Sequence, residues 1–72
     1  MYNFRVERYI ELLDGHTVEW LSKQVGYTNM SLYALFNGRR SCKRALGLAI
    51  CSVLDKDFDD YFYLVEEGDW VW

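Results

Sequence analysis

The chain has 72 residues and a net charge of −3. Its length predicts one domain over residues 1–72. No apolar run approaches the roughly 18 residues needed to cross a bilayer, and the charged N-terminus is unlike a signal peptide. Two cysteines are too few for the framework of a small secreted protein, so we expect a cytoplasmic protein without membrane association. If Cys42 and Cys51 share a helix, they lie on opposite faces, which excludes a disulfide or a shared metal.

Positive and negative charges are segregated along the sequence. Residues 37–54 contain four cations and no acid, whereas residues 55–72 contain seven acids and one lysine. The four cations are Arg39, Arg40, Lys43 and Arg44. An acidic total repels nucleic acid at long range, but this cationic patch can still contact phosphate.

The absence of proline favours helices, and we expect a single all-α domain of five helices. A first helix over about residues 3–13 places apolar side chains on one stripe. The stripe comprises Tyr2, Val6, Tyr9, Ile10 and Leu13. Phe4 and Leu12 lie off it and are therefore candidates for exposed apolar residues. The helix is predicted to end at Asp14-Gly15, because glycine accepts the left-handed conformation.

A second and a third helix are predicted on either side of a glycine turn at Gly26. Thr17 and Thr28 can cap them, because a hydroxyl oxygen accepts a bond from a free backbone N–H. The second helix is expected to turn its apolar and small residues inward, namely Val18, Leu21, Ser22 and Val25. Trp20 is expected to point away from them.

The third helix, over about residues 29–36, is predicted to have two distinct sides. Leu32 and Leu35 define its core side, and Asn37-Gly38 ends it. Its opposite side, called here the outer face, comprises Asn29, Met30, Tyr33, Ala34 and Asn37.

Two further helices and a tail complete the predicted domain. Ser41 is expected to cap a fourth helix that ends near Leu54, with an inner stripe of Cys42, Leu46, Ala49, Ile50 and Val53. Asp57 is expected to cap a short fifth helix, with Phe58, Tyr61, Phe62 and Val65 inward. Residues 66–72 form an acidic, aromatic tail, whose Trp70, Val71 and Trp72 either pack back or contact a partner.

The spacing of core and small residues over 17–38 follows a known pattern. Leu21 is at a core site, Ser22 at a site where two helices cross, and Gly26 at a turn. Leu32 and Leu35 hold the core sites of the following helix. The segment resembles the helix-turn-helix of lambdoid phage repressors and Cro proteins, and the resemblance continues to about residue 65. It implies a lambda-repressor-like fold and a role in transcriptional control.

The surface that reads DNA in that family is different in this chain. A base-reading helix uses Arg, Lys, Gln or Asn, but here the third helix has no cation and only Asn29 is suited to the task. Val18 stands where the family usually has a glutamine that contacts phosphate, and Trp20 where it has a polar residue. Met, Tyr and Trp are preferred at protein interfaces, so the pattern favours a protein partner.

The chain is therefore similar to the small antirepressors, or modulators of repression, of temperate phages. The resemblance implies that it binds the N-terminal DNA-binding domain of a phage repressor and prevents operator binding. The expected contact residues are the outer face (Asn29, Met30, Tyr33, Ala34 and Asn37) with Trp20, Leu12, Glu11 and Asp14. The alternative is a Cro-like repressor or corepressor that binds operator DNA directly, with Arg39, Arg40, Lys43 and Arg44 contacting phosphates.

Catalysis is not expected from these residues. His16 is the only histidine and has no suitably spaced nucleophile. Nothing has metal-ligand spacing, and there is no glycine-rich phosphate loop. We expect no cofactor, no metal and no small-molecule ligand.

Overall fold

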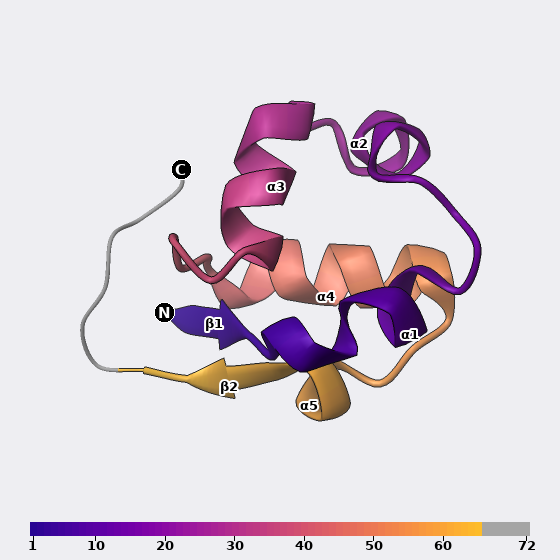
Figure 1. The fold of residues 1–72 in the computed structure, drawn as a ribbon. Helices are drawn as coiled ribbons and strands as arrows, with labels where there is room; N and C mark the ends of the chain where they lie inside the picture. Colours follow the sequence, from indigo (N-terminus) through magenta and orange to yellow (C-terminus); the bar gives the residue numbers. More distant parts are fainter. Residues whose placement is uncertain (66–72) are drawn as a thin grey trace.

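Residues 1–65 form five α-helices, one 3-10 helix and a two-stranded sheet (Figure 1). This computed structural model describes residues 1–65, so the tail over 66–72, with Trp70, Val71 and Trp72, lies outside the described residues. The elements are β1 (Tyr2–Phe4), the 3-10 helix η1 (Val6–Arg8), α1 (Tyr9–Leu13), α2 (Val18–Val25), α3 (Asn29–Phe36), α4 (Arg44–Leu54), α5 (Phe58–Tyr61) and β2 (Phe62–Leu64). Within residues 1–65, no helix is long and apolar enough to cross a membrane.

The expectation of an all-α domain is wrong at both ends of the described chain, although the domain is mostly helical. Residues 2–4 form a strand that pairs antiparallel with β2, so that Phe4 lies opposite Phe62. The backbone bond from Arg5 N–H to the Tyr61 carbonyl, 2.8 Å long, extends this pairing. Three-residue strands give too short an alternation to be told from a helix by periodicity.

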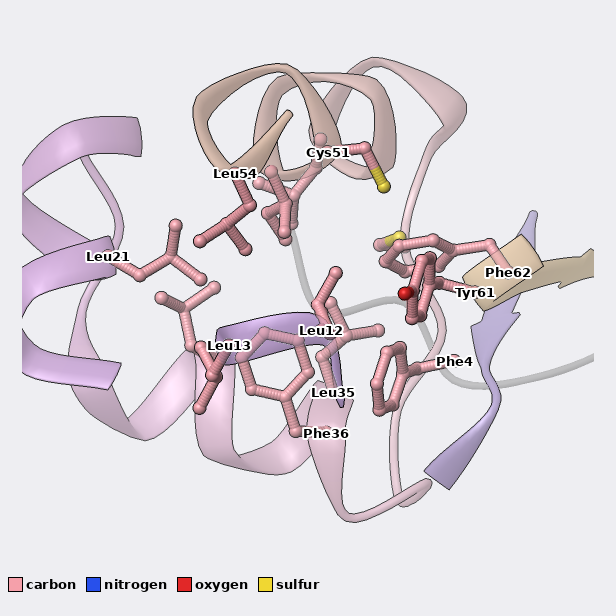
Figure 2. Packing of buried hydrophobic residues seen from close by; sticks show 14 of the residues in the cluster. Phe4, Leu12, Leu13, Leu21, Leu35, Phe36, Cys51, Leu54, Tyr61 and Phe62 are labelled. Atoms are coloured by element: carbon pink, nitrogen blue, oxygen red, sulfur yellow. The ribbon is translucent and has the colours of Figure 1, made fainter. Parts of the chain in front are cut away.

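The predicted stripe of the first helix is correct only in part, because three kinds of backbone share that segment. Leu13 is buried, and Tyr2 and Tyr9 pack against the core as expected. Leu12 is 0% exposed and Phe4 is buried, whereas Ile10 is 81% exposed and Val6 is also exposed. Figure 2 shows Leu12 in the core near Leu35 and Phe4. A strand alternates every two residues and a 3-10 helix repeats every three, so one 100° stripe cannot describe residues 2–13.

The predicted caps of α2 and α3 are confirmed. Thr17 Oγ1 accepts a 3.0 Å bond from the Trp20 N–H, and Thr28 Oγ1 accepts a 3.2 Å bond from the Ser31 N–H. Gly26 ends α2 in the left-handed conformation, with φ of 77°. After α3, Gly38 adopts that conformation, while Asn37 remains right-handed.

The expected inner residues of α2 and α3 are largely in place. Val18, Leu21, Leu32 and Leu35 are buried in the core, and Val25 packs against it while partly exposed. The contacts of α2 are mainly with α3 and α4. Helix α2 therefore packs on both α3 and α4, while α3 also contacts β1.

The start of α4 differs from the prediction, because α4 begins at Arg44 and Ser41 does not cap it. Ser41 is buried and donates a hydrogen bond to Asn3 Oδ1. Cys42 exchanges two 2.8 Å backbone bonds with Tyr2. These two residues therefore extend the sheet region instead of the helix.

The expectation that the two cysteines lie on opposite faces of one helix does not hold, because Cys42 precedes α4 and Cys51 lies within it. Both are buried free thiols. Of the predicted inner stripe, Cys42, Leu46 and Ile50 are buried as expected, whereas Ala49 and Val53 are exposed. Asp57 makes no side-chain cap at α5, and Val65 follows β2 at an intermediate exposure.

Candidate functional site

The outer face of α3 presents apolar groups and no charge. Met30 is 83% exposed, the highest value among the large apolar side chains of residues 1–65, and Tyr33 is 38% exposed. Asn37 is also exposed, while Asn29 and Ala34 are half-buried. The sequence of α3, NMSLYALF, contains no ionisable group other than the Tyr33 phenol. This face is suited to apolar contact with another molecule.

Tyr33 connects the outer face to α2. Its phenol donates a 3.0 Å hydrogen bond to Glu19 Oε2. This bond raises the pKa of Tyr33, and burial and the negative charge of Glu19 raise it further. The phenol therefore stays neutral, and the Glu19 carboxylate is held beside the outer face.

A hollow of about 340 Å³ adjoins Tyr33 on the side of α1. We call it the α1–α3 hollow; it is lined by Tyr9, Ile10, Leu13, Gly15, His16, Thr17, Val18, Glu19 and Tyr33. Leu13 and Val18 are nearly fully buried, whereas Ile10 is exposed. Sequence reasoning missed Ile10 as a surface residue. The spacing of Tyr9, Leu12 and Leu13, at i, i+3 and i+4, is the signal that identifies the inner side of α1.

Trp20 is half-buried, so the expectation that it points away from the domain is met only in part. It packs against the core cluster and stacks on His16, with ring centroids 3.9 Å apart and planes at 14°. His16 lies in the α1–α2 turn, and Trp20 lies in the first turn of α2. Trp20 therefore contributes a supported aromatic surface near the hollow.

Of three further residues expected at the partner surface, one is buried and two are exposed acids that contact other elements. Leu12 is wrong as a contact residue, because its side chain is fully buried in the core. Glu11 accepts a 3.0 Å bond from the Tyr61 hydroxyl and lies 3.8 Å from Arg8. Asp14 lies 3.9 Å from Lys56. The two acids thus contact the region of α5 and the α4–α5 turn.

The four expected phosphate-contacting cations do not act as one group. The Arg44 guanidinium donates a 3.2 Å bond to the Tyr2 hydroxyl and lies over the Phe58 ring, 5.0 Å from its centroid. Arg40 lines a smaller hollow of about 220 Å³ with Met30, Ser31 and Ala34. Arg39 and Lys43 are exposed. Arg40 is therefore the cation that the structure places beside the outer face.

Two further features of the described residues concern metal binding and the reactivity of thiols. Within residues 1–65, no group of three or more His, Cys, Asp or Glu side chains is placed to hold a metal ion. Burial raises the pKa of Cys42 to about 11 and that of Cys51 to about 12. A neutral, buried thiol is a poor nucleophile, so we assign both cysteines to packing of the core.

Comparison with known proteins assigns no family to this geometry. The chain matches no protein-family model, no curated protein and no solved structure at a significant level. A function must therefore be inferred from the surfaces of α1, α2 and α3.

Proposed function

We propose that the chain is an antirepressor built on a repressor-type helix-turn-helix, with α2 and α3 as its two helices. It binds the N-terminal DNA-binding domain of a phage repressor and prevents that domain from binding its operator. One observation carries the proposal: the outer face of α3 exposes Met30 and Tyr33 and has no cation.

The chemistry of this face favours protein over DNA. Base edges in the major groove are read by hydrogen-bonding side chains, which a thioether and a half-buried alanine cannot replace. Met adapts its shape to a partner, and Tyr offers a rigid apolar ring with a polar tip. Val18, at the start of α2, is buried and offers phosphate no donor.

Charge complementarity supports the same partner. A DNA-binding domain presents a cationic surface, because most of its contacts are to phosphates. Glu19 holds a carboxylate beside the outer face through its bond with Tyr33. Attraction between opposite charges raises the rate of encounter more than it raises affinity.

A second candidate, a Cro-like repressor or corepressor that binds DNA directly, is favoured by Arg40. This cation lines the small hollow against Met30 and Ala34, so it lies where it could contact a phosphate beside α3. A single cation next to an uncharged helix gives affinity without sequence preference. We therefore place this candidate second.

The proposal is tested by substituting Met30 with aspartate in the full chain. Because Met30 is 83% exposed, Met30→Asp leaves the fold unchanged, but a carboxylate buried at the interface weakens binding about a thousandfold. The measurement is calorimetric titration with the repressor's N-terminal domain. Leu64→Asp is the matched control, since Leu64 is exposed on β2. Equal affinities for Met30→Asp and the unmodified chain would place the interface elsewhere.

A further inference from the structure

We propose that the α1–α3 hollow receives an apolar anchor side chain of the partner protein, flanked by a lysine or arginine that pairs with Glu19. This inference rests on the proposed function, which requires a protein partner. It adds the point of insertion and the chemistry that the hollow selects.

The apolar part of the hollow is open to a partner and has a packed floor. Leu13 and Val18 are almost fully buried, so their side chains form the bottom. Ile10 is 81% exposed at the same hollow. Its volume of about 340 Å³ is near the lower end of the range of ligand-binding clefts, which is enough for one side chain. A side chain placed against Ile10 would remove from water the most exposed apolar group of α1.

The polar part of the hollow is acidic. Its lining among the described residues includes the Glu19 carboxylate and contains no lysine or arginine. Tyr33 donates its bond to Glu19 Oε2, and a carboxylate can accept several further hydrogen bonds. A cationic group beside the anchor would therefore find an acceptor that is already held in place.

The same charge argues against the chain's own C-terminal segment as the occupant. Trp70 and Trp72 are apolar enough to fill the hollow, but Glu66, Glu67 and Asp69 accompany them in the sequence. Those acids would repel Glu19, whereas a basic partner would be attracted. The hollow also adjoins the outer face through Tyr33, which lines both. One partner can therefore cover Met30 and reach Ile10.

The first experiment uses short peptides as probes of the hollow. The full chain, labelled with ¹⁵N, is titrated with acetylated, amidated Lys-Trp-Lys and, as the charge-reversed control, Glu-Trp-Glu. We expect saturable shifts of the amides of Ile10 and of residues 15–19 with the basic peptide. The acidic peptide should bind roughly two- to fivefold more weakly, because an exposed ion pair changes affinity by about that factor. Shifts elsewhere, no saturation, or equal binding of both peptides would overturn the proposal.

The second experiment separates this inference from the proposed function. Ile10→Asp and Glu19→Gln are measured against the repressor's N-terminal domain, with Leu64→Asp as the exposed apolar control. We expect Ile10→Asp to weaken binding at least tenfold and Glu19→Gln to weaken it about two- to fivefold. If Met30→Asp abolishes binding while both of these variants bind normally, the hollow is not used and the function stands. If Met30→Asp also binds normally, both proposals fail.

Two checks keep these outcomes decisive. Far-ultraviolet circular dichroism reports whether Ile10→Asp is folded; should it unfold, Glu19→Gln and the charge-reversed peptides still decide the matter. Dilution of the labelled chain without peptide tests self-association. Concentration-dependent shifts confined to the hollow would show that a second copy occupies it, which contradicts a basic partner.

Discussion

The Tyr33 phenol of α3 donates a 3.0 Å hydrogen bond to the Glu19 carboxylate of α2, across 14 residues of sequence. This bond couples the two helices on the exposed side of the domain, in addition to their packing in the core. It also places a neutral donor and a negative acceptor at the junction of the outer face and the α1–α3 hollow.

The first prediction concerns the ionisation of Tyr33. The pKa of its phenol lies above the ordinary value of 10.0, because the bond to Glu19 favours the neutral form and the carboxylate opposes a second negative charge. Glu19→Gln should therefore lower the pKa of Tyr33 toward 10.0. The measurement is an NMR titration of the Tyr33 ring. An unchanged pKa in the variant would show that the bond is not formed in solution.

The second prediction tests the inner side of α1. Leu12 is fully buried and Ile10 is 81% exposed, although they are two residues apart. Leu12→Ala should lower the free energy of unfolding by about 2–5 kcal/mol, because it leaves a cavity. Ile10→Ala should change it by less than about 0.5 kcal/mol. Urea denaturation measures both, and the reverse order would restore the single stripe expected from periodicity.

The third prediction concerns stability at high pH. Unfolded thiols ionise near their ordinary pKa of 9.0, whereas those of Cys42 and Cys51 ionise at about 11 and about 12 in the folded chain. The folded state therefore retains protons that the unfolded state loses. The stabilisation is complete below pH 9 and declines as pH rises from about 9 toward 12, by up to about 1.4 kcal/mol per pH unit for each thiol.

The control for this prediction replaces both thiols. The double variant Cys42→Ala with Cys51→Ala should show a shallower decline of unfolding free energy above pH 9. Some decline remains, since the pKa values of Tyr33 and Tyr61 are also raised in the folded chain. Identical slopes for the variant and the unmodified chain would mean that the thiols ionise equally in both states.

The fourth prediction concerns DNA. The chain alone should bind duplex DNA weakly and with little sequence preference, because α3 has no cation and the chain is acidic overall. Residual binding should fall steeply with salt and should weaken in Arg39→Gln with Arg40→Gln. Arg44→Gln should affect stability more than DNA binding, since Arg44 lies against Tyr2 and Phe58. Fluorescence anisotropy at several salt concentrations measures these differences.

Local chemistry made the middle of the chain predictable. A threonine cap and a glycine turn act within four residues, so Thr17, Gly26 and Thr28 could be assigned without the fold. The outer face of α3 followed from the positions of Leu32 and Leu35 alone. The prediction that Met30 and Tyr33 are exposed on this face is confirmed.

Long-range pairing made the ends of the chain unpredictable. Residues 2–4 become a strand because β2 lies beside them, and Ser41 is buried because it bonds Asn3, 38 residues away. Neither partner is evident from local sequence. The α1–α3 hollow was missed for the same reason, because it needs α1 to be rotated so that Leu12 is inside and Ile10 is outside.

The most direct test of the proposed antirepressor function is competition between the chain and operator DNA for the repressor. A labelled operator duplex is bound to the repressor, and the chain is added while a gel-shift reports every complex. We expect free operator to appear as the chain is added, no slower-migrating complex, reversal by excess operator, and no release by Met30→Asp. A stable complex of operator, repressor and chain on one half-site, or tight sequence-specific binding of the chain alone, would contradict the proposed antirepressor function.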